Sequence, residues 1–557
     1  MPAGGFPASS APLSGMEFEA KITPMVITTC VTAATGGLMF GYDIGISGGV
    51  SSMEDFQREF FPTVLHKRRE NKRSNYCRYD NQGLQLFTSS LYLAALVSTL
   101  FASYTTRRRG RRATMRIAGA FFIVGAIFNG AARNLGMLIV GRILLGCGVG
   151  FANQAIPLFL SEVAPTTIRG GLNSLFQLNI TIGILFASLV NYGTNKYLLV
   201  ERQPCFAYFS TINITGVHAY THTNNRFLTS CRIHPWGWRL SLFLAGFPAV
   251  LFTLGTLFMV DTPNSLIERG RQEEGKVVLK KIRGTDNVDP EFNEILEASR
   301  IAHDIKRPFH NLLQRCNRPL LMITILIQMF QQLSGINAIM FYAPVLLTTL
   351  GFKTEASLYS AVITGAVNVL STFVSMYTVD RVGRQMLLLD GGVQMLLSLV
   401  AMAVVMRTKV TDRSDDLDHD WAIMVVVIIC NFVSSFAWSW GPLGWLIPSE
   451  IFPLETRSVG QSISVCTNML FTFVFAQVFL SMLCHLKSFI FVFSSVCVAI
   501  MSLFVIFFLP ETNNISMEEM AERVWKQHWF WKRFMNDGGD NHDVTRERTP
   551  SIMSLFS

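Results

Sequence analysis

The chain has 557 residues, of which 50% are apolar and 15% are charged, whereas about a quarter of the residues of an ordinary soluble protein are charged. This composition excludes a disordered, collagenous or disulfide-rich secreted chain and most soluble enzymes, and it leaves room for about twelve membrane spans of roughly 20 residues each. The net charge of +9 would suggest nucleic acid as the partner of a soluble domain, but in a membrane protein it indicates basic loops on the inner side of the bilayer, so no nucleic-acid partner is expected.

Apolar runs follow one another along the chain, six before and six after a long charged segment. They are longer than about 18 residues and do not alternate with period two, which predicts transmembrane helices rather than strands. The predicted fold is therefore an all-α membrane protein with two six-helix halves, residues 24–261 and 318–509. The predicted spans are residues 24–50, 83–106, 113–132, 136–162, 170–194, 236–261, 318–350, 355–380, 386–408, 420–447, 456–484 and 486–509.

The segments outside the spans are more polar. Residues 1–23 contain no short apolar core with a cleavage site, so they are predicted to be an N-terminus without a signal peptide. Residues 51–82 are predicted to be an exterior lid, and residues 262–317 a helical linker that braces the two halves, with a merely solvated connection as the alternative. Residues 510–557 form a tail in which Trp525, Trp529, Phe530 and Trp531 lie among basic residues, a mixture that suits a membrane surface.

Basic residues in the short loops predict the orientation. Five arginines between Arg107 and Arg112 follow the second span, Arg381 and Arg384 follow the eighth, and the linker is also basic. Since short cytosolic loops carry an excess of Lys and Arg, these segments and both termini are predicted to be cytosolic. The exterior lid is basic too and opposes this assignment, but short loops influence orientation more strongly than long ones.

Two charged motifs occur once in each half at equivalent span positions. Gly110 and Gly383 of one motif are 273 residues apart, and Glu162 and Glu450 of the other are 288 residues apart. These similar offsets indicate a duplicated six-helix unit, and parallel repeats with a substrate site between them resemble the major facilitator architecture. The charged residues of the motifs are Arg108, Arg111, Arg112, Glu162, Arg169, Asp380, Arg381, Arg384, Glu450 and Arg457.

These charged residues are predicted to form a cytosolic latch. Glu162 and Glu450 lie at cytosolic span ends, where arginines can donate bidentate hydrogen bonds to their carboxylates. Such pairs would hold the two halves together while the cytosolic side is closed. The alternative is that the arginines only anchor the helices at the inner surface, and the repeated Glu–Arg spacing argues against it.

Further motifs resemble the sugar porter family of the major facilitator superfamily. They are spread over nearly the whole chain and comprise Gly141-Arg142 with Gly146, Gly148 and Gly150, QQLSGIN at 331–337, GPLGW at 441–445 and PET at 510–512. Two further features, Asp43 in a glycine-rich span and the pair Cys77 and Cys484, resemble those of the plant sugar transport proteins. The tail sequence at 525–531 resembles that of their sugar transport protein 13 subgroup. The resemblance implies import of hexoses across the plasma membrane by alternating access, with H⁺ as the coupling ion and no cofactor.

Asp43 and Arg142 are the predicted proton-coupling residues. Each is a lone charge inside an apolar span of the first half, and an ionisable residue within the membrane is functional by default. The resemblance pairs them and implies that Asp43 binds the proton from the exterior while Arg142 sets its affinity. Protonation would break the pair and let the helices of the first half shift. The alternative is a static buried salt bridge.

The predicted sugar-binding residues are mainly amides. Hexose hydroxyl groups are uncharged and both donate and accept hydrogen bonds, as amides do, and an aromatic ring can stack on the apolar face of a sugar. By resemblance each residue lies at a family sugar contact, although a lone amide in a membrane helix can also serve only to join helices. The residues are Gln177, Gln331, Gln332, Asn337, Asn368 and Trp445, with Asn468, Phe40 and Ile184 as weaker candidates.

Cys77 and Cys484 both map to the exterior, which is oxidising. The resemblance implies a disulfide between the lid and the end of span eleven, which would tie the halves together and shield the proton site. Two free cysteines are the alternative. The chain departs from superfamily patterns at Arg107 and Gln385, which lie within or beside the charged motifs of the first and second halves, and at 261–265.

Residues 197–232 depart most from the family, whose pattern would join residues 193–196 almost directly to 233–239. They match neither a helix nor a strand pattern. We interpret them as a retained intron or an error in the gene model. The alternative is a real exterior loop, glycosylated at Asn213 in the motif Asn213-Ile-Thr215.

The motifs favour transport over other functions. The chain has no phosphate-binding Gly-Lys-Ser/Thr loop, zinc-ligand spacing or nucleophile elbow, so neither an ATP-driven pump nor an enzyme is expected. A facilitative hexose carrier is the first alternative, which Asp43 and Arg142 disfavour, as does Ala437 where facilitative glucose carriers have a glutamate. An inactive or sugar-sensing variant is the second, because of residues 197–232.

Overall fold

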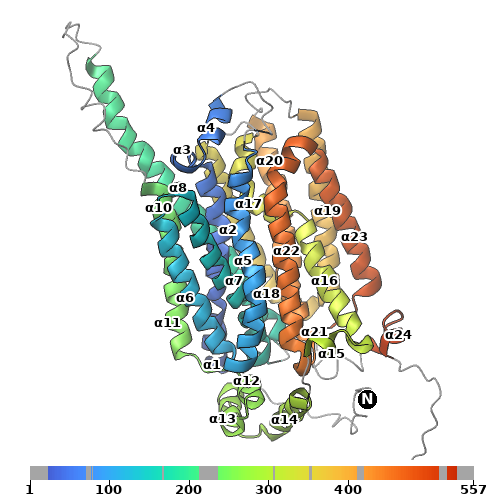
Figure 1. The fold of residues 1–557 in the computed structure, drawn as a ribbon. Coiled ribbons are helices and arrows are strands. Elements are labelled where there is room, and N and C mark those ends of the chain that lie inside the picture. The colour runs from blue at the N-terminus through green and yellow to red at the C-terminus, as the bar shows by residue number, and fades with distance from the viewer. Residues whose placement is uncertain are drawn as a thin grey trace, which may run out of the picture.

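The computed structural model describes residues 23–69, 77, 79–165, 168–212, 236–304, 308–349, 354–409, 419–512 and 524–535. The described residues form helices and connecting turns, with no strand among them. Long helices run side by side in one bundle (Figure 1). Many large apolar side chains on the bundle are exposed, such as Phe258, Leu370 and Phe101 at 89%, 67% and 66%, as expected for a surface that faces lipid.

The helices fall into a first half, a linker and a second half. Those of the first half are α1 (Pro24–Ala34), α2 (Gly36–Ser52), α3 (Glu54–Phe60), α4 (Pro62–Arg69), α5 (Gln82–Arg109), α6 (Arg111–Gly130), α7 (Leu135–Val163), α8 (Arg169–Ile212), α10 (Trp236–Phe243) and α11 (Gly246–Phe258). Those of the linker are α12 (Pro263–Glu268), α13 (Gln272–Arg283), α14 (Asp289–Asp304), α15 (Pro308–Leu312) and the 3₁₀ turn η3 (Arg315–Asn317). Those of the second half and the tail are α16 (Arg318–Leu333), α17 (Ile336–Thr349), α18 (Thr354–Val382), α19 (Arg384–Lys409), α20 (His419–Trp438), α21 (Trp440–Ile451), α22 (Leu454–Leu486), α23 (Phe489–Phe508) and α24 (Lys532–Met535).

Eleven segments of the described chain are long and apolar enough to cross a membrane, each at a predicted span. The remaining predicted span, 318–350, which is the seventh along the chain, is divided into α16 and α17. These helices meet at Ser334 and Gly335, where Gly335 has a φ of +85°. Three other spans are also interrupted, between α1 and α2 at Thr35, between α10 and α11 at residues 244–245, and between α20 and α21 at Ser439. Transporters place such broken helices at their substrate sites, and the break at Gly335 lies between the predicted sugar-binding residues Gln332 and Asn337.

The linker helices α12–α14 lie beneath one end of the bundle, which we call the linker end, and α3 and α4 lie at the other, which we call the lid end (Figure 1). Arg283 at the end of α13 donates to the carbonyl of Val163 at 3.2 Å and pairs with Glu291 of α14 at 2.6 Å. An exposed ion pair between Lys276 and Asp289 at 2.6 Å raises the pKa of Lys276 and lowers the pKa of Asp289. Because α14 also contacts α22, the linker touches both halves and is more than a solvated connection.

Helix α8 differs from its predicted span. It continues from residue 194 to Ile212 and extends beyond the bundle at the lid end (Figure 1). Residues 197–212 are therefore helical, although their sequence matches no helical pattern. Residues 213–232, with the Asn213 motif, lie outside the described residues.

The glycine-rich α2 packs closely on α8. Gly41, Gly45 and Gly49 recur every fourth residue, so they share one face of the helix. A Cβ atom on Gly41 would lie 1.9 Å from the carbonyl oxygen of Ile180, and one on Gly49 would lie 2.0 Å from the amide nitrogen of Asn191. Such small residues let two membrane helices approach backbone to backbone.

The tail packs against the bundle. Trp525 and Trp531 are each only 1% exposed, and the indole N–H of Trp531 donates to the carbonyl of Phe508 at 2.7 Å. These contacts satisfy a carbonyl at the end of α23 that has no partner within its helix. Of the three tail tryptophans only Trp529 is exposed, at 54%, so the prediction that the cluster faces a membrane surface is wrong for Trp525 and Trp531.

An acidic side chain caps the N-terminus of the third span in each half, which is α6 in the first half and α19 in the second. Asp261 accepts a hydrogen bond from the backbone N–H of Arg112 at 3.4 Å, and Glu511 accepts from those of Arg384 and Gln385 at 3.0 Å each. Carboxylates are favoured at helix N-termini by the unpaired N–H groups and the helix dipole. The two halves therefore share this feature in space, in agreement with the predicted duplication.

Gly110, which precedes α6, is expected to tolerate no side chain. Its φ is +90°, and an added Cβ would lie 2.1 Å from Oδ2 of Asp261. Gly110→Ala should therefore reduce the free energy of unfolding by about 1–3 kcal/mol, measured as thermal stability in detergent. The matched control is Gly270→Ala, since Gly270 has a φ of +79° but no atom near the new Cβ. An equal loss in both variants would show that backbone strain alone matters and that the contact with Asp261 does not.

Candidate functional site

Asp43 and Arg142 form a buried ion pair between α2 and α7. Their side chains are 1% and 0% exposed, and Nη1 of Arg142 donates to Oδ1 of Asp43. The guanidinium group lies over the ring of Phe87 on α5, 4.1 Å from the ring centre. Oδ2 of Asp43 and Nη2 and Nε of Arg142 have no hydrogen-bond partner within the described part of the chain. The carboxylate therefore keeps one oxygen on which a proton could bind.

Tyr92 on α5 belongs to the same surroundings and was missed by the sequence analysis. Its hydroxyl group is buried without a hydrogen-bond partner in the described chain, and it interacts electrostatically with Asp43 and Arg142. Its ring stacks on Phe341 of α17, with 5.2 Å between ring centres. Tyr92 therefore joins the ion pair of the first half to the second half. A lone tyrosine in the middle of an apolar span was the available signal.

The predicted amides of the second half lie together. The side-chain amide of Gln331 donates to the carbonyl of Trp440 at 2.8 Å, and that of Asn468 donates to Oε1 of Gln331 at 2.9 Å. Asn468 also donates to Gln328 at 2.6 Å, and Gln328 in turn donates to Ser464 at 3.0 Å. Gln328 was missed, although it lies one helical turn before Gln331 on the same face of α16.

A second amide pair lies on either side of the break between α16 and α17. The side chain of Asn337 donates to Oε1 of Gln332 and, at 3.2 Å, to the hydroxyl of Thr472 on α22. The break at Gly335 turns the start of α17 so that these two amides meet. This arrangement presents several neutral donors and acceptors, which suit an uncharged polyhydroxylated ligand.

The first half contributes Gln177, which faces α21 of the second half. It is 7% exposed, and a Cβ added to Gly441 would lie 3.2 Å from its amide nitrogen. On the same two helices, Phe176 packs edge-on against Trp445 with 5.8 Å between ring centres. Asn368 of α18 is 3% exposed, and its Oδ1 has no partner among the residues described.

The two apolar candidates lie in the first half, Phe40 on α2 and Ile184 on α8. Ile184 lines a pocket between α2, α8, α17 and α18 together with Ser188, Asn191, Met340 and Thr364. Phe40 is buried on α2, 6% exposed.

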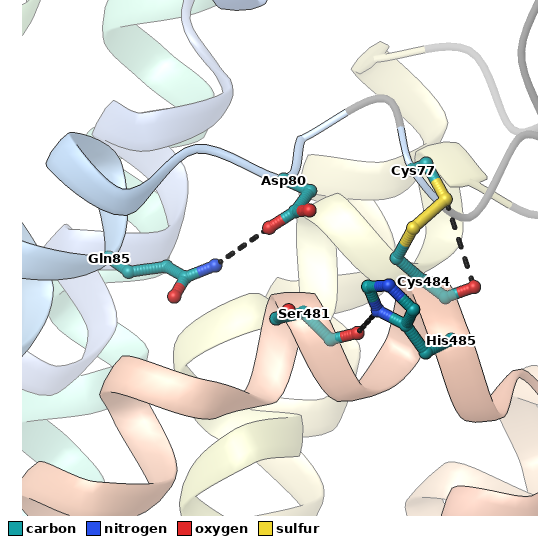
Figure 2. The surroundings of a disulfide bond; sticks show 6 residues. All are labelled: Cys77, Asp80, Gln85, Ser481, Cys484 and His485. Atoms are coloured by element: carbon teal, nitrogen blue, oxygen red, sulfur yellow. Dashed lines mark hydrogen bonds between the residues drawn. A yellow bond between two sulfur atoms is a disulfide. The ribbon is translucent and has the colours of Figure 1, made fainter.

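A disulfide links Cys77, which follows the lid helices, to Cys484 near the end of α22. Figure 2 shows the bond beside the hydrogen bond from Gln85 to Asp80, 3.2 Å long, at the start of α5. The disulfide joins the two halves covalently at the lid end. Nearby, Ser89 of α5 donates to Gln477 of α22 at 2.6 Å.

The charged motifs at the linker end form two clusters, one in each half. Arg111 is 1% exposed and pairs with Glu162 at 2.7 Å and with Glu268 of α12 at 2.6 Å. Arg384 pairs with Asp380 at 3.2 Å and lies 3.6 Å from Glu450. The pairs Arg111–Glu162 and Arg384–Glu450 each lie within one half, although such pairs are predicted above to join the halves. The pair of Arg111 with Glu268 joins the first half to the linker.

The link between the halves comes from Asp380. Its carboxylate accepts hydrogen bonds from the backbone N–H groups of Gly170 and Gly171 at 3.1 and 2.8 Å, at the first turn of α8. Arg169 beside them interacts electrostatically with Glu450. The linker end is therefore closed by a carboxylate bound to a helix N-terminus, an arrangement that the helix dipole favours.

Other motif arginines make local contacts instead. Arg108 and Arg381 are exposed and lie over the rings of Tyr104 and Tyr377, at 4.6 and 3.9 Å from the ring centres. Arg112 donates to carbonyls at the end of α11, and Arg457 to the carbonyl of Phe452 at 3.2 Å.

Comparisons with known proteins agree with this geometry. The pattern of the family "Sugar (and other) transporter" matches residues 29–524. The chain is 72% identical over 542 residues to Sugar transport protein MST4 of Oryza sativa subsp. japonica, covering 97% of this chain and 98% of the relative. It is 63% identical over 551 residues to Sugar transport protein 13 of Arabidopsis thaliana, covering 99% and 98%.

Solved structures of the proton:xylose symporter XylE from E. coli have the same fold. The form bound to 6-bromo-6-deoxy-D-glucose superposes with a TM-score of 0.72 at 24% identity, covering 91% of this chain and 100% of that one. The predicted all-α major facilitator fold is thereby confirmed. The chain therefore belongs to the sugar transporter family, as a multi-pass membrane carrier and not an enzyme.

Proposed function

We propose that this protein imports hexoses together with protons across the plasma membrane, with its linker end and both termini in the cytosol. The observation that carries the proposal is the Asp43–Arg142 pair, which is buried inside the first half and leaves one carboxylate oxygen without a partner in the described chain. A static salt bridge needs no such open position. Two relatives are named as sugar transport proteins, and XylE is named as a proton:xylose symporter, which supports the same function.

Proton binding and sugar binding can be coupled through α2. Protonation of Asp43 removes the negative charge that holds Arg142, so α2 is released from α7. Because α2 packs backbone to backbone on α8 through Gly41 and Gly45, a shift of α2 moves α8. Gln177 lies on α8 and faces α21, so this movement reaches the proposed sugar site between the halves.

Release to the cytosol requires the linker end to open. The hydrogen bonds from Gly170 and Gly171 to Asp380 cross between the halves there and must break. The disulfide keeps the halves covalently linked at the lid end throughout the cycle. The two halves would therefore rotate relative to each other while this one connection at the lid end is kept.

Uptake of radiolabelled glucose in yeast that lacks its own hexose carriers tests the proposal. We expect accumulation above the external concentration, and we expect a protonophore to abolish that accumulation. Uptake that equilibrates and ignores the protonophore would instead identify a facilitative carrier. A panel of competing hexoses in the same assay would define the substrate.

Deletion of residues 197–232 is expected to preserve uptake if the segment is an insertion. The deletion joins the end of the predicted fifth span to the residues before α10, as the family pattern does. The measurement compares uptake and surface abundance of the full chain and the deleted chain. Loss of uptake at equal surface abundance would show that the segment is a working part of the protein, and sequencing of transcripts across 196–233 would show whether it is expressed.

Replacement of both Cys77 and Cys484 by serine is expected to leave the fold intact but to make uptake more sensitive to external pH. The disulfide lies at the lid end, on the route by which external protons would reach Asp43. The measurement is the pH profile of uptake, compared with that of Cys466→Ser, which removes a free cysteine of α22. An unchanged profile in the double variant would restrict the disulfide to a structural role.

A further inference from the structure

Four buried amides lie between the halves on the linker side of the proposed sugar site. Asn153 and Gln154 belong to α7, Asn173 to α8 and Gln461 to α22, and they are 0%, 0%, 3% and 0% exposed. All four make contacts across the interface. Gln154 donates to the carbonyl of Ser458 at 2.8 Å, Gln461 to that of Asn153 at 3.5 Å, and Asn173 to the hydroxyl of Ser449 at 2.8 Å.

These amides are only partly satisfied. Both side-chain polar atoms of Asn153 and the side-chain oxygens of Gln154, Asn173 and Gln461 have no hydrogen-bond partner in the described chain. The large majority of buried side-chain polar atoms in proteins have a partner, either protein or ordered water, and each unsatisfied group costs about 1–3 kcal/mol. An interface that served only to close the halves would be more stable with apolar side chains, so the amides need another explanation.

The positions of the amides extend the proposed sugar site. Asn173 precedes Gln177 by four residues on α8, which places it on the same helix face and about 6 Å nearer the linker end. Gln461 precedes Asn468 by seven residues on α22, again on the same face and about 10.5 Å nearer that end. One element of each half therefore continues the amide lining from the central site toward the linker end.

We propose that Asn153, Gln154, Asn173 and Gln461 form a second hexose-binding position, which the sugar occupies on its way to the cytosol. Sugar hydroxyl groups both donate and accept, so they can satisfy the amide atoms that lack partners when the halves part. While Asp380 of α18 binds the first turn of α8, the halves stay in contact around these amides. The position therefore becomes available to sugar only after the linker end opens. The inference rests on the proposed sugar site and names a further part of it.

The test measures the half-saturating sugar concentration from each side of the membrane. Asn153→Leu and Gln461→Met keep the side-chain size but remove the polar atoms. Each is expected to raise the half-saturating concentration about ten-fold from the cytosolic side, the effect of losing about 1.4 kcal/mol, and to leave the exterior value unchanged. Transport in right-side-out and inside-out vesicles gives the two values. The matched control is Thr324→Val, which removes a buried hydroxyl without a partner in the described chain, on α16.

Two results would overturn the proposal. Unchanged values on both sides would show that no sugar binds to these amides. A rise on the cytosolic side with a matching fall on the exterior side would show that the amides only shift the balance between the open states. Asn173→Leu repeats the test from α8 in case one variant does not fold, and Gln331→Met, at the central site, should raise both values. If Gln331→Met changes neither value, the proposed sugar site itself is wrong, whereas failure of the amide variants alone rejects only the second position.

Discussion

Asp43→Asn is expected to abolish concentrative sugar uptake while sugar exchange across the membrane continues. Asparagine has the shape of aspartic acid but carries no charge and binds no proton, so it mimics the protonated state permanently. Without a titrating carboxyl group the proton gradient has no group through which to act, and internal sugar should rise only to the external concentration. Uptake should also lose its dependence on external pH. The measurements are accumulation at steady state and counterflow at several pH values.

The control for this variant is Asp286→Asn, which makes the same chemical change on an exposed linker residue that pairs with Lys280 at 3.2 Å. It should leave accumulation and its pH dependence unchanged. If Asp43→Asn retains proton-driven accumulation, Asp43 is not the proton-binding group and the pair with Arg142 is the static salt bridge of the alternative interpretation. Loss of counterflow as well would show that the charge is needed for conformational exchange and not only for coupling.

Arg111→Met is expected to cause the largest loss of stability. The guanidinium group of Arg111 is buried between Glu162 and Glu268 at 2.7 and 2.6 Å, so its removal leaves two carboxylates without their cation. Breaking a buried ion pair on one side costs about 3–5 kcal/mol. Thermal unfolding in detergent, followed by loss of the monodisperse species, measures the effect. Glu162→Gln should cost less, because the amide can still accept from Thr262, which donates to this side chain at 2.5 Å.

Arg108→Met is the matched control, since Arg108 belongs to the same motif but is exposed over Tyr104. Surface substitutions of this kind usually change stability by about 0.5 kcal/mol or less. A similar loss in both variants would mean that the motif acts only through its total charge at the inner membrane surface. A large loss in Arg111→Met alone would identify this arginine as the centre of the cluster.

The predicted spans agree closely with the structure, and the physical reason is the membrane. A helix that crosses a bilayer must be long and apolar, so each span can be recognised from one continuous run of apolar residues. Residues 197–212 show the limit of this rule, because they form the outer part of α8 without an apolar pattern. The lone charges Asp43 and Arg142 were identified for the same reason, since charges inside apolar spans are rare and costly.

Side-chain partners were predicted less well. Arg108 and Arg111 are three residues apart in one motif, yet Arg108 is exposed and Arg111 is buried between two acids. One of those acids, Glu268, lies in the linker, 157 residues away along the chain. No local pattern indicates which arginine of a basic run points inward, because that depends on how α6 meets α7 and α12.

The sequence by itself therefore determined the six-plus-six helices, the family and the candidate residues for protons and sugar, because these follow from apolar length, duplicated motifs and isolated polar residues within spans. The tertiary structure alone decided that span seven breaks at Gly335, that Asp380 binds the first turn of α8 at the linker end, and that buried amides continue beyond the central site. These features arise where helices distant in the sequence pack together, and the hydrogen bonds available at each contact depend on geometry that no single segment contains.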